Sequence, residues 1–88
     1  MDVILSRKIY DFVNTIYINK KVTGRDFKGM NRSQFWLMSR YLRDNGIITV
    51  NGINDRNERL WILTSKGKKF TEAAKQVMAI LNGEEEDN

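Results

Sequence analysis

The side chains best able to do chemistry in this 88-residue chain are its arginines, because the sequence contains neither histidine nor cysteine. Histidine is the commonest general base and metal ligand, and cysteine supplies every thiolate. The carboxylates that remain form no cluster with metal-ligand spacing. We therefore expect no enzyme, no metal site and no cofactor. Arginine binds phosphate oxygens and the edges of guanine bases instead.

Basic residues outnumber acidic ones over most of the chain. There are 15 Lys and Arg against 11 Asp and Glu, and four of the acids stand together at positions 84–87. Without those four, 15 basic residues face 7 acidic ones, a formal charge of +8. A folded body this basic is typical of a protein that binds a polyanion such as nucleic acid. A basic protein without such a partner is the alternative.

Several of the arginines fall on one face of an expected helix over residues 32–45. Asn31 with Gln34 three residues later indicates the start of the helix, and Asn45-Gly46 indicates its end. At 100° per residue, one side carries Phe35, Met38 and Leu42. The opposite side carries Ser33, Trp36, Leu37 and Arg40, with Arg32 and Arg43 at its edge. The apolar side is expected to face the core and the other side to face solvent.

The solvent-facing side has the donors that base recognition needs. Arg32 and Arg40 can each hold guanine O6 and N7 together, and Ser33 can bind a base or a phosphate. Trp36 and Leu37 are expected to press on thymine methyl groups or on sugars. Two other interpretations of Trp36 stay open. In the first, its ring packs against the first helix or the hairpin. In the second, it forms part of a protein interface.

The elements that position this face follow from the apolar spacing. A first helix over 3–19 carries the stripe Leu5, Ile9, Phe12, Val13, Ile16 and Tyr17. Thr23 and Asp26 cap a short second helix over 24–28, which Gly29 ends. Strands over 47–50 and 60–63 form a hairpin with a long polar loop, 51–59, and Val22 is a candidate short strand. Thr64 or Ser65 caps a last helix over 65–82, which Gly83 ends.

This order predicts a mostly helical α+β fold with one domain over residues 1–83. The acidic tail, 84–88, is expected to be disordered. The second and third helices are joined by a three-residue turn, 29–31, which is helix-turn-helix spacing. No apolar run is long enough to cross a membrane and no signal-peptide pattern begins the chain, so we expect a cytoplasmic protein without a membrane partner.

Two stretches carry a resemblance to a known family. SRYLRDNGII, from Ser39, resembles the end of a winged-helix recognition helix entering its first wing strand, and WILTSKG, from Trp61, resembles the second wing strand entering the last helix. Both are similar to the MarR, PadR and ArsR types of winged-helix transcription regulators of bacteria, archaea and archaeal viruses. The resemblance covers about residues 9–75. It implies a winged helix-turn-helix with a three-helix core, a β-hairpin wing and a C-terminal helix.

The chain departs from two of these types. The Cys and His ligands of metal-sensing ArsR proteins are missing, so metal sensing is not implied. MarR-type proteins are longer and have extra dimerisation helices, of which this chain has at most one, so their ligand pocket is not carried over. The absence of cysteine and the Ile, Lys and Asn content indicate an archaeal or viral origin.

The resemblance implies that the third helix enters the DNA major groove and that the hairpin lies along the minor groove. At the hairpin tip, the negative potential of a narrow minor groove favours Arg56 and Arg59, with Asn57 between them. A solvated loop with charges of both signs is the alternative. Around the second helix, phosphate contacts are expected from Thr23, Arg25 and Lys28.

The last helix carries more apolar residues than one inward stripe needs. Near its end these residues are Val77, Met78, Ile80 and Leu81. We expect a second copy to cover this patch and form a two-fold homodimer, which matches a palindromic DNA site with half-sites about one helical turn apart. Packing of the last helix on the first alone is the alternative.

Together the patterns predict a sequence-specific double-stranded DNA-binding regulator of transcription. Two other functions remain open from the sequence. One is a winged-helix protein-interaction module anchored by Trp36 and Leu37, because fold does not fix function. The other is an architectural protein that coats DNA without sequence preference.

Overall fold

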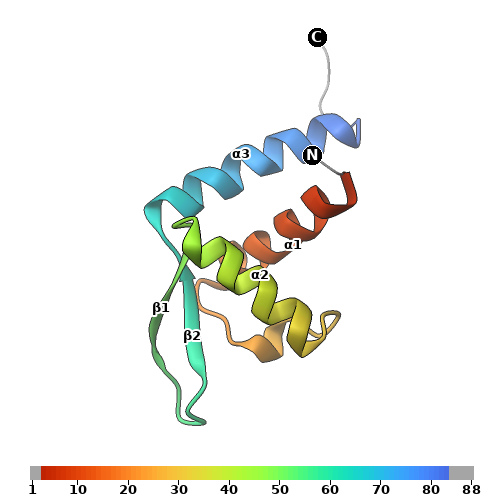
Figure 1. Ribbon diagram of the computed structural model, residues 1–88. Helices are drawn as coiled ribbons and strands as arrows, with labels where there is room; N and C mark the ends of the chain where they lie inside the picture. The colour runs from red at the N-terminus through yellow and green to blue at the C-terminus, as the bar shows by residue number, and fades with distance from the viewer. Residues whose placement is uncertain (1–2, 84–88) are drawn as a thin grey trace.

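The computed structural model describes residues 3–83, and their side chains from Arg7 onward. Within this range the protein is a mostly helical α+β fold, as predicted (Figure 1). Its elements are α1 (Val3–Asn19), the 3-10 turn η1 (Gly24–Asp26), α2 (Arg32–Asp44), β1 (Ile48–Ile53), β2 (Arg59–Leu63) and α3 (Ser65–Leu81). The acidic tail predicted over 84–88 lies outside the described residues.

The second helix expected over residues 24–28 is instead the single turn η1. The predicted cap is present, because the Asp26 carboxylate accepts the Thr23 backbone N–H at 2.8 Å and the Thr23 hydroxyl accepts the Arg25 N–H at 3.3 Å. Phe27 then leaves helical geometry, with φ −112° and ψ 65°, and its ring stacks on Phe12 at 4.3 Å. A segment this short gains little from helix propagation, so burial of Phe27 decides its backbone.

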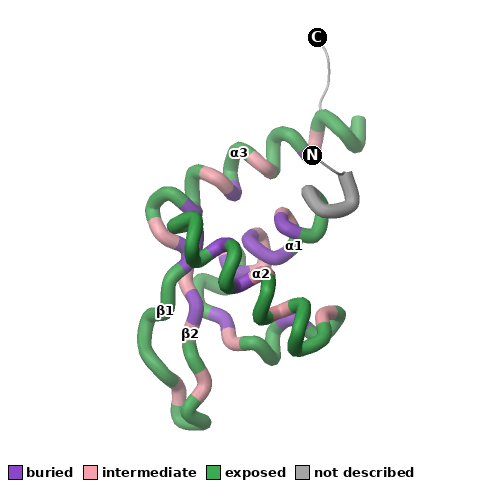
Figure 2. Tube along the Cα trace, viewed as in Figure 1, coloured by how far each residue is buried: buried purple, intermediate pink, exposed green. Residues whose placement is uncertain are grey.

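The core lies where α1 meets α2, the hairpin and the loop after η1. The predicted stripe of α1 is buried at Ile9, Phe12, Val13 and Ile16, and Tyr17 is half-buried. Leu5 lies outside the described side chains. Opposite α1, the core is completed by Val22, Phe27, Leu42, Ile47, Ile48, Trp61 and Leu63. Figure 2 shows this burial concentrated on the inner side of α1 and at the base of the hairpin.

The hairpin is longer than predicted and its turn is shorter. The pairs Ile48–Leu63, Thr49–Ile62 and Val50–Trp61 are followed by a register shift, so that Ile53 pairs with Arg59. Asn51-Gly52, which the sequence placed in the loop, is therefore a bulge within β1, where Gly52 takes φ 88°. The Asn54 side-chain oxygen organises the real turn by accepting the backbone N–H groups of Arg56 and Glu58. Val22 pairs with Trp61 on the free edge of β2, as predicted for a short strand.

The segment Thr64–Gly67 fixes the start of α3 against the end of α2. The Thr64 hydroxyl donates to the carbonyl of Gly46 at 2.5 Å and accepts the Gly67 N–H at 2.9 Å. The Thr64 backbone N–H donates to the Ile47 carbonyl at 3.0 Å. Lys66 Nζ donates to the Asn45 carbonyl at 2.8 Å, which satisfies an oxygen just past the last turn of α2. The motif WILTSKG thus joins the hairpin, α2 and α3 at one point.

The helices α1 and α3 are in contact, as Figure 1 shows. The Tyr17 hydroxyl donates to Glu72 Oε2 at 2.9 Å across this contact, and the bond to a carboxylate raises the pKa of the phenol above its ordinary value. Thr71 and Met78 are the buried residues on the inner side of α3 beyond Gly67. No helix in the described part of the chain combines the length and apolar character needed to cross a membrane.

Candidate nucleic-acid interface

The helix α2 has the orientation that its apolar spacing predicted. Leu42 is 1% exposed, and Phe35 and Met38 are half-buried against the core. On the opposite side Trp36 is 55% exposed and Leu37 is 61% exposed. Arg32, Ser33, Arg40 and Arg43 are exposed as well. The capping box at Asn31 and Gln34 is present, with distances of 2.8 and 3.3 Å, so the helix begins where the sequence predicted.

A groove of about 420 Å³ runs between α2 and the half of β2 nearest the hairpin turn. From α2 it receives Trp36, Arg40 and Arg43, and from β2 it receives Arg59. Its other lining residues are Gly24, Phe35, Ser39, Glu58 and Trp61. We call it the arginine groove. It brings together four predicted site residues from two elements, and three of them carry guanidinium groups.

Local contacts orient two of these guanidinium groups. The Arg40 guanidinium lies over the Trp36 ring, 5.2 Å from its centroid, at a distance where a cation is attracted to the ring face. Arg40 and Arg43 share the Asp44 carboxylate, with N···O distances of 3.9 and 3.8 Å. These pairs are solvent-exposed and weak. One carboxylate between two arginines leaves a net positive charge on this part of α2.

Across the groove, Glu58 ties the hairpin to η1. Its Oε2 accepts the Arg25 Nε–H at 2.7 Å and its Oε1 accepts the Asn54 side-chain N–H at 3.0 Å. The hydrogen bond from Asn54 first, and then the one from Arg25, hold the pKa of this carboxyl below its ordinary value. Arg25 is therefore paired within the protein, and its charge is only partly available for the phosphate contact predicted for it.

The remaining predicted residues lie outside the arginine groove. Arg32 and Ser33 form the first turn of α2. Arg56 and Asn57 are exposed at the hairpin tip, where Asn57 takes the left-handed φ of 63° that asparagine tolerates. Thr23 is half-buried and caps η1.

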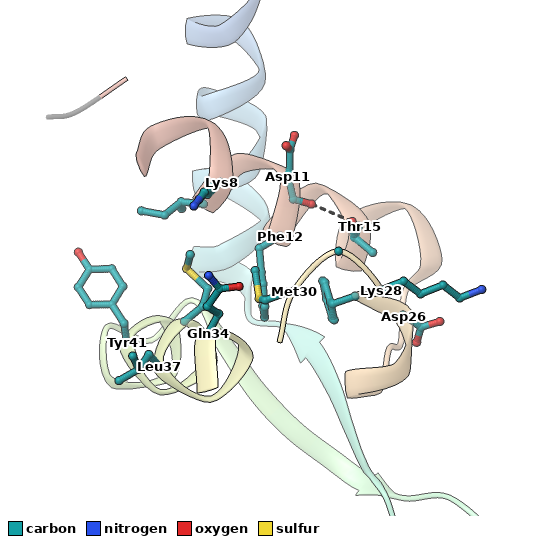
Figure 3. Close-up of a pocket in the computed structure, with 14 residues that line it drawn as sticks. Lys8, Asp11, Phe12, Thr15, Asp26, Lys28, Met30, Gln34, Leu37 and Tyr41 are labelled. Atoms are coloured by element: carbon teal, nitrogen blue, oxygen red, sulfur yellow. Dashed lines mark hydrogen bonds between the residues drawn. The ribbon is translucent and has the colours of Figure 1, made fainter. Parts of the chain in front are cut away.

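A second groove, of about 780 Å³, lies on the other flank of α2, between it and α1. Figure 3 shows Phe12 and Met30 at its centre and Leu37 and Tyr41 on its α2 side. Its charged lining residues are of both signs: Lys8, Lys28, Asp11 and Asp26. We call it the apolar groove. The predicted residues Leu37 and Lys28 thus face this groove and not the arginine groove.

At the end of α3, three of the four predicted interface residues are exposed. Val77 is 51% exposed, Ile80 is 63% exposed and Leu81 is 57% exposed. Met78 is only 8% exposed, so it adds little surface to this patch. It lies on the inner side of α3, four residues along the helix from the half-buried Ala74, and this chain already covers it.

Glu58 and the groove itself are what sequence reasoning missed. In the sequence, Glu58 is only one of the charges of both signs in the hairpin loop. Its pairing with Arg25 spans 33 positions along the chain, and no local spacing indicates such a contact. Arg43 and Arg59 were predicted separately, and only the docking of the hairpin beside α2 brings them to one groove.

Comparison with family models, with curated proteins and with solved structures found no match to this chain. The geometry of the grooves and the chemistry of their side chains therefore carry the functional argument.

Proposed function

We propose that this protein is a sequence-specific double-stranded DNA-binding regulator of transcription, of the winged-helix type. In this proposal α2 lies in the major groove and the hairpin serves as the wing along the minor groove. The observation that carries it is the arginine groove, in which Arg40, Arg43 and Arg59 converge from two elements beside an exposed tryptophan.

The shape and charge of this region suit duplex DNA. The exposed side of α2 projects from the body as a helix flanked by grooves, and a major groove about 12 Å wide admits an α-helix. Arg32 and Ser33 lie in the first turn of α2, where the N-terminal residues of a recognition helix reach base edges. The arginine groove then lies where the sugar-phosphate backbone between the major and minor grooves would pass. Backbone contacts fix register, while base contacts select sequence.

Within this arrangement the arginines take different roles. Arg40, whose guanidinium lies over the exposed Trp36 ring, is assigned to a guanine. Arg43 and Arg59 line opposite walls of the groove and are assigned to phosphates. These assignments make separable predictions, because removing a base contact relaxes specificity and removing a phosphate contact weakens binding to every sequence.

The test is a mobility-shift titration over a range of salt concentrations, with duplexes selected from a random pool and with unselected duplexes. We expect Arg40→Ala to cost about 1–3 kcal/mol on the selected site and to reduce its preference over random DNA. Arg43→Ala is expected to weaken both duplexes alike and to lower the salt slope by about 1. Arg7→Ala, an exposed residue of α1 outside the grooves, is the matched control.

Three results would contradict the proposal. The first is that the wild-type protein does not bind duplex DNA even at low salt. The second is that Arg7→Ala weakens binding as much as Arg40→Ala or Arg43→Ala. The third is equal affinity for selected and random duplexes, which would indicate an architectural protein that coats DNA.

We further propose that the protein acts as a homodimer through the exposed end of α3. Val77, Ile80 and Leu81 lie at helical spacing and are more than half exposed, which is unusual for three neighbouring large apolar residues on a protein surface. A two-fold axis there would present two copies of α2 to a palindromic site.

The apolar groove favours one second candidate function, a protein-interaction module. Its floor of Phe12, Met30 and Met38, with Leu37 at its side, is the kind of surface that receives an amphipathic helix. In that case Leu37→Ala would abolish capture of a protein partner, while Arg43→Ala would leave capture unchanged and neither variant would affect a DNA titration.

A further inference from the structure

A third groove lies where the hairpin meets the end of α1 and the start of α3. Ile62 and Leu63 of β2 and Ile16 and Tyr17 of α1 line it, whereas the arginine groove takes Arg59 and Trp61 from the same strand. The volume of the groove is about 410 Å³. Asn51 of the β1 bulge forms part of its wall.

Three lysines converge on this groove from two distant parts of the chain. Lys20 and Lys21 follow the end of α1, and Lys68 lies in the first turn of α3. All three side chains are exposed. Among the described residues, no aspartate or glutamate lines this groove, although Glu72 lies next to it and accepts the Tyr17 hydroxyl. We call it the lysine groove.

Like charges gathered in one groove repel one another, and an anion in the groove relieves that repulsion. The arginine groove carries Glu58 on its wall and Asp44 beside its arginines. The lysine groove has no such acid among its described lining residues. Three lysines against the one neighbouring carboxylate of Glu72 leave a net positive charge, which favours a ligand with closely spaced negative charges.

The backbone at Lys20 is a second and independent observation. Lys20 takes φ 73°, a left-handed conformation that disfavours residues with a Cβ and that glycine or asparagine adopts with less strain. The Lys20 ammonium group lies 5.5 Å from the centroid of the Tyr17 ring, which also lines the groove. The left-handed residue that ends α1, with its N–H donated to the Ile16 carbonyl at 2.8 Å, thus places this ammonium group at the groove.

We propose that the lysine groove is a second binding site for a phosphodiester backbone, so that the hairpin is held between two nucleic-acid strands. This inference rests on the proposed function, in which the first strand lies in the arginine groove. The second strand is either the one across the minor groove of the same duplex or a strand of a second duplex. Both sources offer the same chemistry, a run of phosphates at regular spacing.

The test compares two triple variants that remove the same charge. The groove variant is Lys20→Asn with Lys21→Gln and Lys68→Gln, where asparagine keeps the left-handed conformation accessible. The control variant is Lys8→Gln with Lys69→Gln and Lys75→Gln, three exposed lysines outside the lysine groove. Thermal unfolding of both variants checks that each is folded before any binding is measured.

Titration of a duplex over a range of salt concentrations gives the first readout. If the second strand belongs to the same duplex, we expect the groove variant to lower the salt slope by about 2 to 3. Each phosphate that a lysine no longer neutralises lowers the slope by about 0.9. The control variant is expected to change the slope by less than about 1. If the second strand belongs to a second duplex, sedimentation is expected to show more duplexes bound per wild-type chain than per chain of the groove variant.

Amine labelling read by mass spectrometry gives the second readout. Saturating duplex DNA is expected to protect Lys20, Lys21 and Lys68 from an amine-reactive reagent and to leave Lys75 reactive. The proposal is overturned if the two triple variants match in slope and stoichiometry and the three lysines stay reactive while DNA is bound. That outcome leaves the arginine groove as the one DNA-binding site proposed. Failure of the wild-type protein to bind any duplex would overturn the proposed function as well.

Discussion

Glu58 is an acid on the wall of a groove that we assign to a polyanion, and its contacts explain its presence there. It joins the turn of the hairpin to η1 through Asn54 and Arg25. The position of Arg59, the next residue, depends on that connection. The Glu58 carboxylate would repel DNA phosphates, but it also positions the Arg59 guanidinium, which would attract them.

The lowered pKa of Glu58 predicts a pH dependence. Because its pKa in the folded protein lies below the ordinary value of 4.5, the ionised carboxylate stabilises the fold fully above that value, and this stabilisation is lost as pH falls through the folded-state pKa. We expect the melting temperature of Glu58→Gln to lie below that of the wild type at neutral pH and to converge with it in acid.

Thermal unfolding between pH 7 and pH 3 measures this convergence, with Asp55→Asn in the same turn as the control. A gap between wild type and Glu58→Gln that stays constant down to pH 3 would contradict the stabilising role given to these hydrogen bonds.

Within the site, the burial and exposure of the α2 side chains were the most predictable from the sequence. A helical period separates Phe35, Met38 and Leu42 from Trp36, Leu37 and Arg40, and the structure buries and exposes them accordingly. A contact such as Arg25 with Glu58 has no local signal, because its geometry depends on how two loops meet. Tyr41, 57% exposed in the apolar groove, follows Leu37 by four residues, so the same helical period could have identified it.

At the scale of elements, Gly67 determines how closely α3 approaches the end of α2. A Cβ at this position would collide with the backbone carbonyl of Ile47 and contact the Leu63 side chain. Neither neighbour moves easily, since Ile47 and Leu63 are both in the core. The glycine is therefore required by this close approach.

We predict that Gly67→Ala destabilises the protein by about 2–3 kcal/mol, within the range typical of overpacking. Gly29→Ala is the matched control, because a Cβ at Gly29 meets no atom within 4 Å. Urea unfolding followed by circular dichroism gives both values. Equal stability of the two variants would show that α3 does not dock as described.

Long elements were predictable from the sequence and short ones were not. The bounds of α1, α2 and α3 lie within one residue of the expected helices, because each has a long apolar period and α2 and α3 also have a cap and a glycine stop. η1 and the β1 bulge differ from expectation. At η1, burial of Phe27 outweighs helix formation. In β1, the conformation of Gly52 accommodates one extra residue within the strand. Both outcomes depend on tertiary contacts.

At the scale of the whole molecule, the two basic grooves arise where the hairpin meets α2 and where it meets the end of α1 and the start of α3. The sequence predicted the hairpin and the basic residues separately. It did not indicate that two basic grooves flank one hairpin, because their lining residues come from positions 20–24, 35–68 and the end of α1.

The exposed end of α3 carries the prediction of a dimer. We expect Ile80→Glu to shift the protein from dimer to monomer, because a buried unpaired charge at an apolar interface is costly. Ile18→Glu is the control, since Ile18 is 67% exposed at the far end of α1. Sedimentation equilibrium measures the masses. A wild-type protein that is monomeric at high concentration would contradict this prediction.

The central claim is that duplex DNA covers the arginine groove, and Trp36 reports on it directly. Its ring is 55% exposed, whereas the other tryptophan, Trp61, is 6% exposed. Acrylamide quenching of tryptophan fluorescence therefore reports mainly on Trp36 in the free protein, and Trp36→Phe supplies the Trp61 signal alone. We predict that saturating duplex DNA removes most of the quenching that Trp36 contributes and leaves the Trp36→Phe signal unchanged. Trp36 that stays fully open to acrylamide at saturating DNA would contradict the claim.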